Sequence, residues 1–114
     1  VFQPHRYSRT AEFLDGFAEA LSTADAVLLA PLYSAGERPI KGISSEALAK
    51  AISARKPQLP VGVARDNDEL TALVARASRP GDLVLAMGAG DINGLWDRLS
   101  RLPSQEGPLS LLAA

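Results

Sequence analysis

Short apolar runs alternate with amphipathic stretches along most of this sequence. Three runs contain no charged side chain, at Ala26–Ala30, Val61–Ala64 and Leu83–Met87. Between them, apolar residues recur at three- and four-residue steps, which is the pattern of a helix with one buried face. Continuous apolar runs are typical of strands in a parallel sheet whose two faces are covered by helices. The alternation therefore predicts an α/β fold with a mainly parallel sheet. Ala26–Ala30 is expected to be buried on both faces, Val61–Ala64 to be a short strand, and Leu83–Met87 to be a further buried strand.

Four helices are predicted around these strands. They are expected at approximately residues 9–22, at 45–55, from Asp66 onward, and at 91–102. Ser44 or Ser45 can cap the second helix, and Asp66 with Glu69 forms a capping-box-like start of the third. Asp91 is interpreted as the cap of the last helix. The buried stripe of the first helix would consist of Phe13, Leu14, Phe17, Ala18 and Leu21.

The two ends of the sequence differ from the middle. Val1-Phe2-Gln3 resembles the end of a buried strand, so we expect the chain to be a piece cut from a longer protein. Loss of most of a strand should expose a sheet edge or an apolar face, and a dimer of the isolated chain is therefore expected. We predict a domain over residues 1–103 and a tail over residues 104–114, which have no clear period.

Composition excludes several classes of protein. Twelve Lys and Arg against thirteen Asp and Glu leave a net charge of -1, so no nucleic-acid partner is predicted. No apolar run is long enough to span a membrane, and no membrane partner is predicted. Cysteine is absent and there is a single histidine, so no metal site is predicted. These features fit a cytoplasmic protein.

Three loops contain most of the unusual chemistry of the chain. The loops are His5–Arg9, Tyr33–Gly42 and Gly88–Asp91, and each follows a predicted strand or the initial strand fragment. Because the strands are parallel, their C-terminal ends share one edge, and ligands of such sheets bind beyond that edge. The sequence therefore predicts that these loops meet at a ligand-binding edge.

Arg6 and Arg9 lie at the start of the first predicted helix, where the helix dipole makes a cation mildly unfavourable. Guanidinium groups bind carboxylate or phosphate in a bidentate manner, and free N–H groups at the helix start would contribute. Alternatively, both arginines are solvated and pair with Glu12 or Asp15. His5 could contact a substrate or orient an arginine, or it could simply fill a gap at the end of the strand.

The other two loops give weaker signals. Gly88-Ala89-Gly90 does not continue to a G-x-G-x-x-G pattern, so its glycines are interpreted as a tight turn or as a place where another domain approaches closely. Glu37 could contact a cationic group or remain a solvated carboxylate. The sequence has no G-K-[ST] phosphate loop and no nucleophile elbow. The residues alone therefore predict an α/β ligand-binding domain of a larger enzyme, with no catalytic residue.

The stretch from Phe2 to Thr10 reads F-Q-P-H-R-Y-S-R-T. It resembles the F-Q-P-H-R-Y-[ST]-R motif of the Mur ligase family. Residues 33–43 and 81–92 resemble two further segments of that family, so the resemblance covers the chain up to about Leu102.

This resemblance implies most of a Rossmann-like C-terminal domain, a three-layer sandwich that lacks its first strand and helix. It implies a ligase that uses ATP and Mg²⁺ to activate the carboxylate of UDP-N-acetylmuramate as an acyl phosphate and joins it to L-alanine, in peptidoglycan precursor synthesis. By motif position, Arg6 and Arg9 would hold the carboxylate of L-alanine, with His5 lining the same pocket. Tyr33 and Glu37 would face the active site.

The same resemblance implies that ATP and Mg²⁺ are bound mainly by domains outside this chain. We therefore expect the 114 residues to be inactive on their own. Two alternatives remain at this point: a sister Mur ligase that adds a peptide during wall recycling, and a non-catalytic binding module of Rossmann type.

Overall fold

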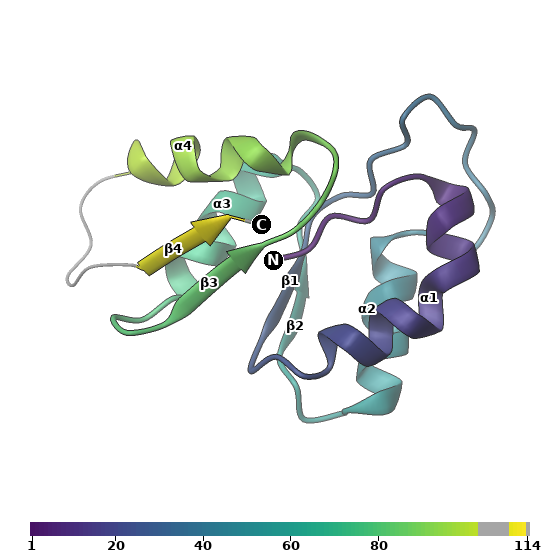
Figure 1. The fold of residues 1–114 in the computed structure, drawn as a ribbon, viewed down its shortest axis with the longest axis horizontal. Helices are drawn as coiled ribbons and strands as arrows, with labels where there is room; N and C mark the ends of the chain where they lie inside the picture. Colours follow the sequence, from purple (N-terminus) through teal and green to yellow (C-terminus); the bar gives the residue numbers. More distant parts are fainter. Residues whose placement is uncertain (103–109, 114) are drawn as a thin grey trace.

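The computed structural model describes residues 1–102 and 110–113 (Figure 1). In chain order its elements are α1 (Tyr7–Leu21), β1 (Val27–Leu29), α2 (Ser45–Arg55), β2 (Val61–Val63), α3 (Asn67–Ala77), β3 (Leu83–Ala86), the 3₁₀ helix η1 (Asp91–Gly94), α4 (Leu95–Ser100) and β4 (Ser110–Ala113). The predicted alternation of helices and strands is confirmed. Among the described residues, no helix is both long and apolar enough to cross a membrane.

The segment Val1–Gln3 occupies the centre of a row of parallel strands. Phe2 forms parallel bridges with Leu29 on one side and with Met87, just after β3, on the other. β2 pairs with β1, and β4 pairs with β3, both in parallel. The spatial order is thus β2, β1, Val1–Gln3, β3, β4. This is the order of Rossmann folds, in which ligands bind beyond the C-terminal ends of the strands where the direction of winding reverses.

Helices cover this row of strands on both faces. Successive residues of a strand point to opposite faces, and accordingly Val27 and Leu29 pack with α1 and α2, whereas Leu28 and Ala30 pack with α3 and α4. The side chains that fill the two cores from the helices include Ala18, Leu21, Leu48 and Ile52 on the first face and Leu70, Val74, Leu95 and Leu99 on the second. The predicted three-layer arrangement is therefore confirmed (Figure 1).

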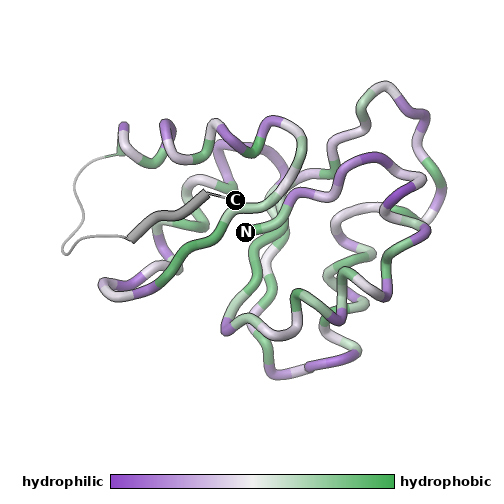
Figure 2. The backbone as a smooth tube through the Cα atoms, viewed as in Figure 1, coloured by the Kyte–Doolittle hydropathy of each residue, from purple (hydrophilic) through white to green (hydrophobic). Residues whose placement is uncertain are grey.

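β3 departs from the prediction because one of its faces is open. Leu83 is 67% exposed and Leu85 is 38% exposed, so our prediction of a buried strand here is wrong for this face. Val84 and Ala86 pack in the core formed with α3 and α4. The helices α1 and α2 lie over β1 and β2 instead, and the apolar β3 (green in Figure 2) extends beyond them.

The helix ends differ in detail from the predicted ones. α1 begins at Tyr7, and its backbone is kinked at Phe13, where φ is -110° and ψ is 18°. Phe13 is 49% exposed, so its predicted place in the buried stripe is wrong. The last predicted helix is divided into η1 and α4.

The predicted caps of α2 and α3 are confirmed. The Ser44 hydroxyl accepts from the Ala47 N–H at 3.1 Å, and the Asp66 carboxylate accepts from the Glu69 N–H at 2.7 Å.

Part of the predicted tail forms β4, at Ser110–Ala113. The remainder of that tail and its boundary at residue 103 lie outside the described residues.

Candidate functional site

The first two predicted loops are joined by backbone pairing at the C-terminal ends of the strands. His5 forms a parallel bridge with Tyr33. The Tyr33 N–H donates to the Pro4 carbonyl at 2.9 Å, and the Arg6 N–H donates to the Tyr33 carbonyl at 2.7 Å. The rings of His5 and Tyr33 stack with their centroids 5.7 Å apart and their planes 8° from parallel. These two predicted site residues therefore form one aromatic surface, and Tyr33 is 41% exposed on it.

Gln3 attaches the third loop to the other two. Its amide nitrogen donates to Asp91 Oδ1 at 2.6 Å and to the Pro31 carbonyl at 3.4 Å. Its amide oxygen accepts from the Ile92 N–H at 3.2 Å. The side chain is buried, with 2% of its surface exposed. We did not predict Gln3 as a site residue, although a polar amide beside Phe2 in an apolar strand fragment was a usable signal.

Asp91 does not cap a helix, and that prediction is wrong. The N-cap of η1 is Gly90, with no side-chain hydrogen bond. The Asp91 carboxylate accepts from Gln3 on one oxygen and from Asn67 Nδ2, at 2.8 Å, on the other. The hydrogen bond from Gln3, followed by that from Asn67, lowers the pKa of Asp91. The carboxylate is therefore ionised at neutral pH and connects the loop after β3 with the start of α3.

The glycines of the third loop allow the close approach of groups from the same chain, whereas we predicted a tight turn or the approach of another domain. A Cβ atom at Gly90 would lie 2.7 Å from the Gln3 amide oxygen and 2.7 Å from Cγ of Tyr33. A Cβ atom at Gly88 would lie 3.0 Å from Cβ of Gln3. The third loop thus packs directly against Gln3 and against the ring that stacks on His5.

Arg6 has a strained backbone at the N-cap of α1. Its φ is 68° and its ψ is 143°, a region that a residue with a side chain rarely adopts. The conformation is held because the Arg6 N–H donates to Tyr33 and the Arg6 carbonyl accepts from the Thr10 hydroxyl at 2.7 Å. Such strain costs about 1–3 kcal/mol and is typical of ligand-binding positions.

Glu37 occupies the N-terminus of α1. Its carboxylate accepts from the Ser8 N–H at 3.0 Å and from the Ser8 hydroxyl at 2.6 Å. These hydrogen bonds, with a smaller contribution from the charge of Arg6, lower the pKa of Glu37. We expected free N–H groups at this helix start to contribute to anion binding, and for Ser8 that expectation is wrong because its N–H donates to Glu37.

The side chains of Arg6 and Arg9 are both exposed. Within residues 1–102 neither arginine forms a salt bridge, so the alternative pairing with Glu12 or Asp15 does not occur. Exposed guanidinium groups without a salt bridge are able to bind a small carboxylate. The described residues contain no group of three His, Cys, Asp or Glu that could hold a metal ion.

A cavity of about 240 Å³ opens at the same edge of the sheet. It lies between the starts of α1 and α2 and the end of β2, and Tyr7, Ser44 and Arg65 are among its lining residues. Arg65 is paired with Glu69 at 2.7 Å. This cavity extends the candidate site toward β2.

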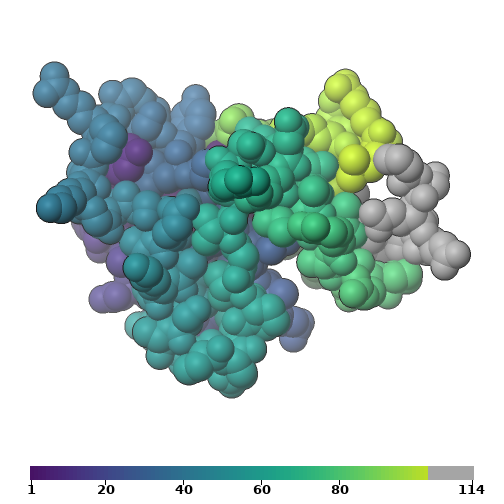
Figure 3. All heavy atoms as spheres, turned by 180° about the vertical axis from the view of Figure 1, so that it is seen from behind, coloured from purple at the N-terminus to yellow at the C-terminus, as the bar shows by residue number. Residues whose placement is uncertain are grey.

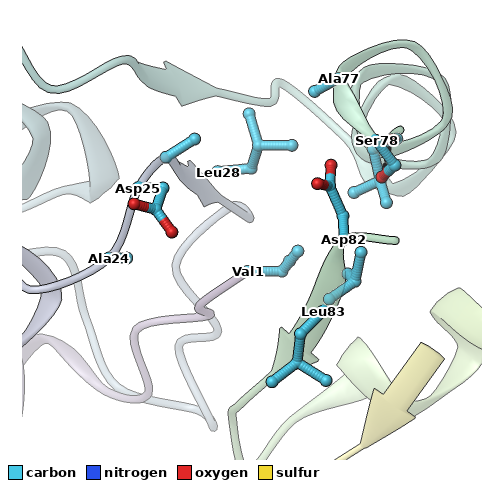
Figure 4. A pocket seen from close by; sticks show the side chains of 11 residues that line it. Val1, Ala24, Asp25, Leu28, Ala77, Ser78, Asp82 and Leu83 are labelled. Atoms are coloured by element: carbon cyan, nitrogen blue, oxygen red, sulfur yellow. Dashed lines mark hydrogen bonds between the residues drawn. The ribbon is translucent and has the colours of Figure 1, made fainter. Parts of the chain in front are cut away.

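Another cavity, of about 360 Å³, lies at the opposite end of the strands (Figure 4). Val1, Leu28 and Val84 line it together with Asp25 and Asp82, between the starts of β1 and β3. Seen from behind, the surface is notched between the segments that lead into these strands (Figure 3). Among the described residues that line this cavity there is no basic side chain and none of the predicted site residues.

Comparison with known proteins gives a family and close relatives. The family profile described as "Mur ligase, glutamate ligase domain" matches residues 1–90. The UDP-N-acetylmuramate–L-alanine ligase of Prochlorococcus marinus (strain MIT 9303) is 61% identical over 114 residues, which is 100% of this chain and 23% of the relative. The protein of that name from Synechococcus sp. (strain CC9605) is 62% identical over 100 residues, 88% of this chain and 21% of the relative. The protein of that name from Synechococcus sp. (strain RCC307) is 53% identical over 107 residues, which is 94% of this chain and 22% of the relative. The chain thus spans less than a quarter of the length of these relatives.

Proposed function

Because this chain belongs to the Mur ligase family, in which it matches the glutamate ligase domain, we propose that it is the amino-acid-binding C-terminal domain of an ATP-dependent ligase. The full-length protein would act in the cytoplasm and join L-alanine to UDP-N-acetylmuramate in the synthesis of peptidoglycan precursors. The observation that carries this proposal is the 53% to 62% sequence identity to relatives named UDP-N-acetylmuramate–L-alanine ligase.

In this proposal the edge around His5 binds the incoming amino acid. Arg6 and Arg9 hold the carboxylate of L-alanine, because both guanidinium groups are exposed and form no salt bridge among the described residues. The stacked rings of His5 and Tyr33 form the adjacent wall. Glu37 keeps the start of α1 in place through Ser8 and thereby fixes the backbone that presents both arginines.

The residues that the structure describes form no site that fits Mg²⁺, and the sequence has no phosphate loop for ATP. No described group of three potential ligands could hold a metal ion, and the sequence has no G-K-[ST] phosphate loop. We therefore assign ATP and Mg²⁺ to parts of the full-length protein outside this chain and derive no step of nucleotide chemistry from these residues.

The test of this function is substrate-dependent phosphate release by the full-length protein. With ATP, Mg²⁺ and UDP-N-acetylmuramate, we expect L-alanine to stimulate release strongly and a short peptide to stimulate it little. Stronger stimulation by the peptide than by L-alanine would indicate the sister ligase that adds a peptide. If neither L-alanine nor the peptide stimulated phosphate release, the proposal would be overturned. The 114 residues alone should release no phosphate under the same conditions.

Two arginine variants test the proposed carboxylate contact. Arg6→Ala and Arg9→Ala should each raise the KM for L-alanine about 10- to 100-fold, because a charge-assisted contact contributes about 1.5–3 kcal/mol. The KM values for ATP and UDP-N-acetylmuramate should change little. Arg55→Ala, at an exposed arginine near the C-terminus of α2, is the matched control and should leave all three KM values unchanged.

A further inference from the structure

We propose that Gln3 is a positioning residue of the amino-acid site, which it orders through its hydrogen bond to Asp91. The inference rests on the proposed function and adds to it a residue that makes no contact with the ligand. Gln3 is buried, so it cannot itself touch L-alanine.

The first step is the place of Gln3 in the sheet. It belongs to the central segment Val1–Gln3, from which the chain winds outward in both directions. Through Pro31, Asp91 and Ile92, its amide reaches the segments that follow β1 and β3. Asn67, at the start of α3, donates to the second oxygen of Asp91 and so connects the segment after β2 to the same network. One amide thus connects the C-terminal ends of four neighbouring segments.

The second step is that the orientation of this amide is fixed. Its nitrogen has two acceptors and its oxygen has one donor, so a flipped amide would face like groups at all three contacts. Leaving a buried donor or acceptor unpaired costs about 1–3 kcal/mol. The position of Asp91 relative to the central strand is therefore well defined.

The third step connects this network to the proposed ligand surface. Gly90, next to Asp91, lies against both the Gln3 amide and the ring of Tyr33. Tyr33 stacks on His5, which follows Gln3 by two residues. A displacement of the loop at Asp91 is therefore transmitted through Gly90 to Tyr33 and His5. A misplacement of about 1 Å in such a site can reduce the rate about 100-fold.

Exchanging the polarity of the hydrogen bond provides a sharp test in the full-length ligase. Gln3→Glu places a second carboxylate against that of Asp91. Asp91→Asn places an amide nitrogen, which is a donor, against the amide nitrogen of either Gln3 or Asn67. In the double variant, the amide at position 91 can donate to the carboxylate at position 3 and still accept from Asn67. The carboxylate at position 3 can also accept from the Ile92 N–H, so only the 3.4 Å contact with the Pro31 carbonyl is not restored.

We expect each single variant to lower kcat/KM for L-alanine about 10- to 100-fold, mainly through KM, with the KM values for ATP and UDP-N-acetylmuramate unchanged. The double variant should recover to within about fivefold of the wild type, since only the weakest contact is lost. Gln58→Glu, at an exposed glutamine, is the matched control and should behave as the wild type. If a charged single variant does not fold, Gln3→Met keeps the side-chain volume without a charge and should show the same selective rise in KM.

Thermal unfolding of every variant separates positioning from general destabilisation. A folded Gln3→Glu or Gln3→Met protein with an unchanged KM for L-alanine would overturn the inference. The inference would also be overturned if KM rose equally for all three substrates. It would be overturned as well if kcat/KM of the double variant for L-alanine were no higher than that of the single variants. A wild-type protein without alanine-dependent phosphate release would instead overturn the proposed function, and this inference with it.

Discussion

The carboxylate of Glu37 accepts two hydrogen bonds from Ser8, one from the backbone N–H at 3.0 Å and one from the hydroxyl at 2.6 Å. A side chain from the loop after β1 thus satisfies the first turn of α1, whose N-cap residue Arg6 makes no side-chain cap. Negative charge is favourable at this end of a helix. Glu37 therefore offsets the unfavourable placement of Arg6 and Arg9 and keeps the long loop on the helix start.

This relationship predicts a pH-dependent contribution of Glu37 to stability. Its pKa is lowered in the folded protein, so the unfolded chain takes up the proton first as the pH falls. The contribution is complete well above the unfolded pKa of about 4.3 and is lost as the pH falls through the lower folded pKa. In thermal unfolding, Glu37→Gln should be less stable than the wild type at pH 7, and the difference should shrink below about pH 4.

Glu12→Gln provides the control for this measurement, because Glu12 is exposed and makes none of these hydrogen bonds. Its melting temperature should follow that of the wild type at both ends of the pH range. A difference between the wild type and Glu37→Gln that stays constant from pH 7 to pH 3 would contradict the assignment.

The strained backbone of Arg6 predicts that stability and ligand binding change in opposite directions. Arg6→Gly releases strain of about 1–3 kcal/mol, while the freedom of glycine in the unfolded chain costs about 0.5–1 kcal/mol. We expect the free energy of unfolding to rise by about 1 kcal/mol in urea titrations, whereas the KM of the full-length ligase for L-alanine rises.

Arg9→Gly is the matched comparison, because Arg9 lies within α1 and has no positive φ. It should also raise the KM for L-alanine, but it should lower the free energy of unfolding by up to about 1 kcal/mol. Equal destabilisation by both glycine substitutions would show that the backbone of Arg6 is not under strain.

The sequence predicts the elements and the edge at which the loops meet, because these follow from local patterns. Apolar runs indicate strands, and the serine at position 44 and the aspartate at position 66 indicate helix starts, as the structure confirms. The partner of Asp91 is not locally encoded, because Gln3 lies 88 residues away in the sequence. The open face of β3 has a similar cause. Leu83 and Leu85 belong to an apolar run like the others, and only the placement of α1 over β1 and β2 leaves them uncovered.

The packing at Gly90 predicts that a single methyl group disturbs the amino-acid site. Gly90→Ala would bring Cβ within 2.7 Å of both Tyr33 and Gln3, so overpacking should cost about 1–3 kcal/mol and raise the KM for L-alanine. Gly16→Ala is the control, because the residue is helical and its added methyl group would have no neighbouring atom within 4 Å. It should stabilise the protein by about 0.5–1 kcal/mol and leave the KM unchanged. Equal effects of the two substitutions would contradict this account.

The open face of β3 predicts self-association of the isolated 114-residue chain. Leu83 and Leu85 are exposed side by side on one face of the strand, and burial of a leucine stabilises an association by about 1.5–3 kcal/mol. Sedimentation at increasing concentration should detect a dimer, and the double substitution Leu83→Lys, Leu85→Lys should weaken it by more than about tenfold. Ile40→Lys, at an exposed isoleucine in the loop after β1, should leave the association unchanged. A clean monomer at high concentration would contradict the prediction, because a second copy of the chain would then not cover these leucines.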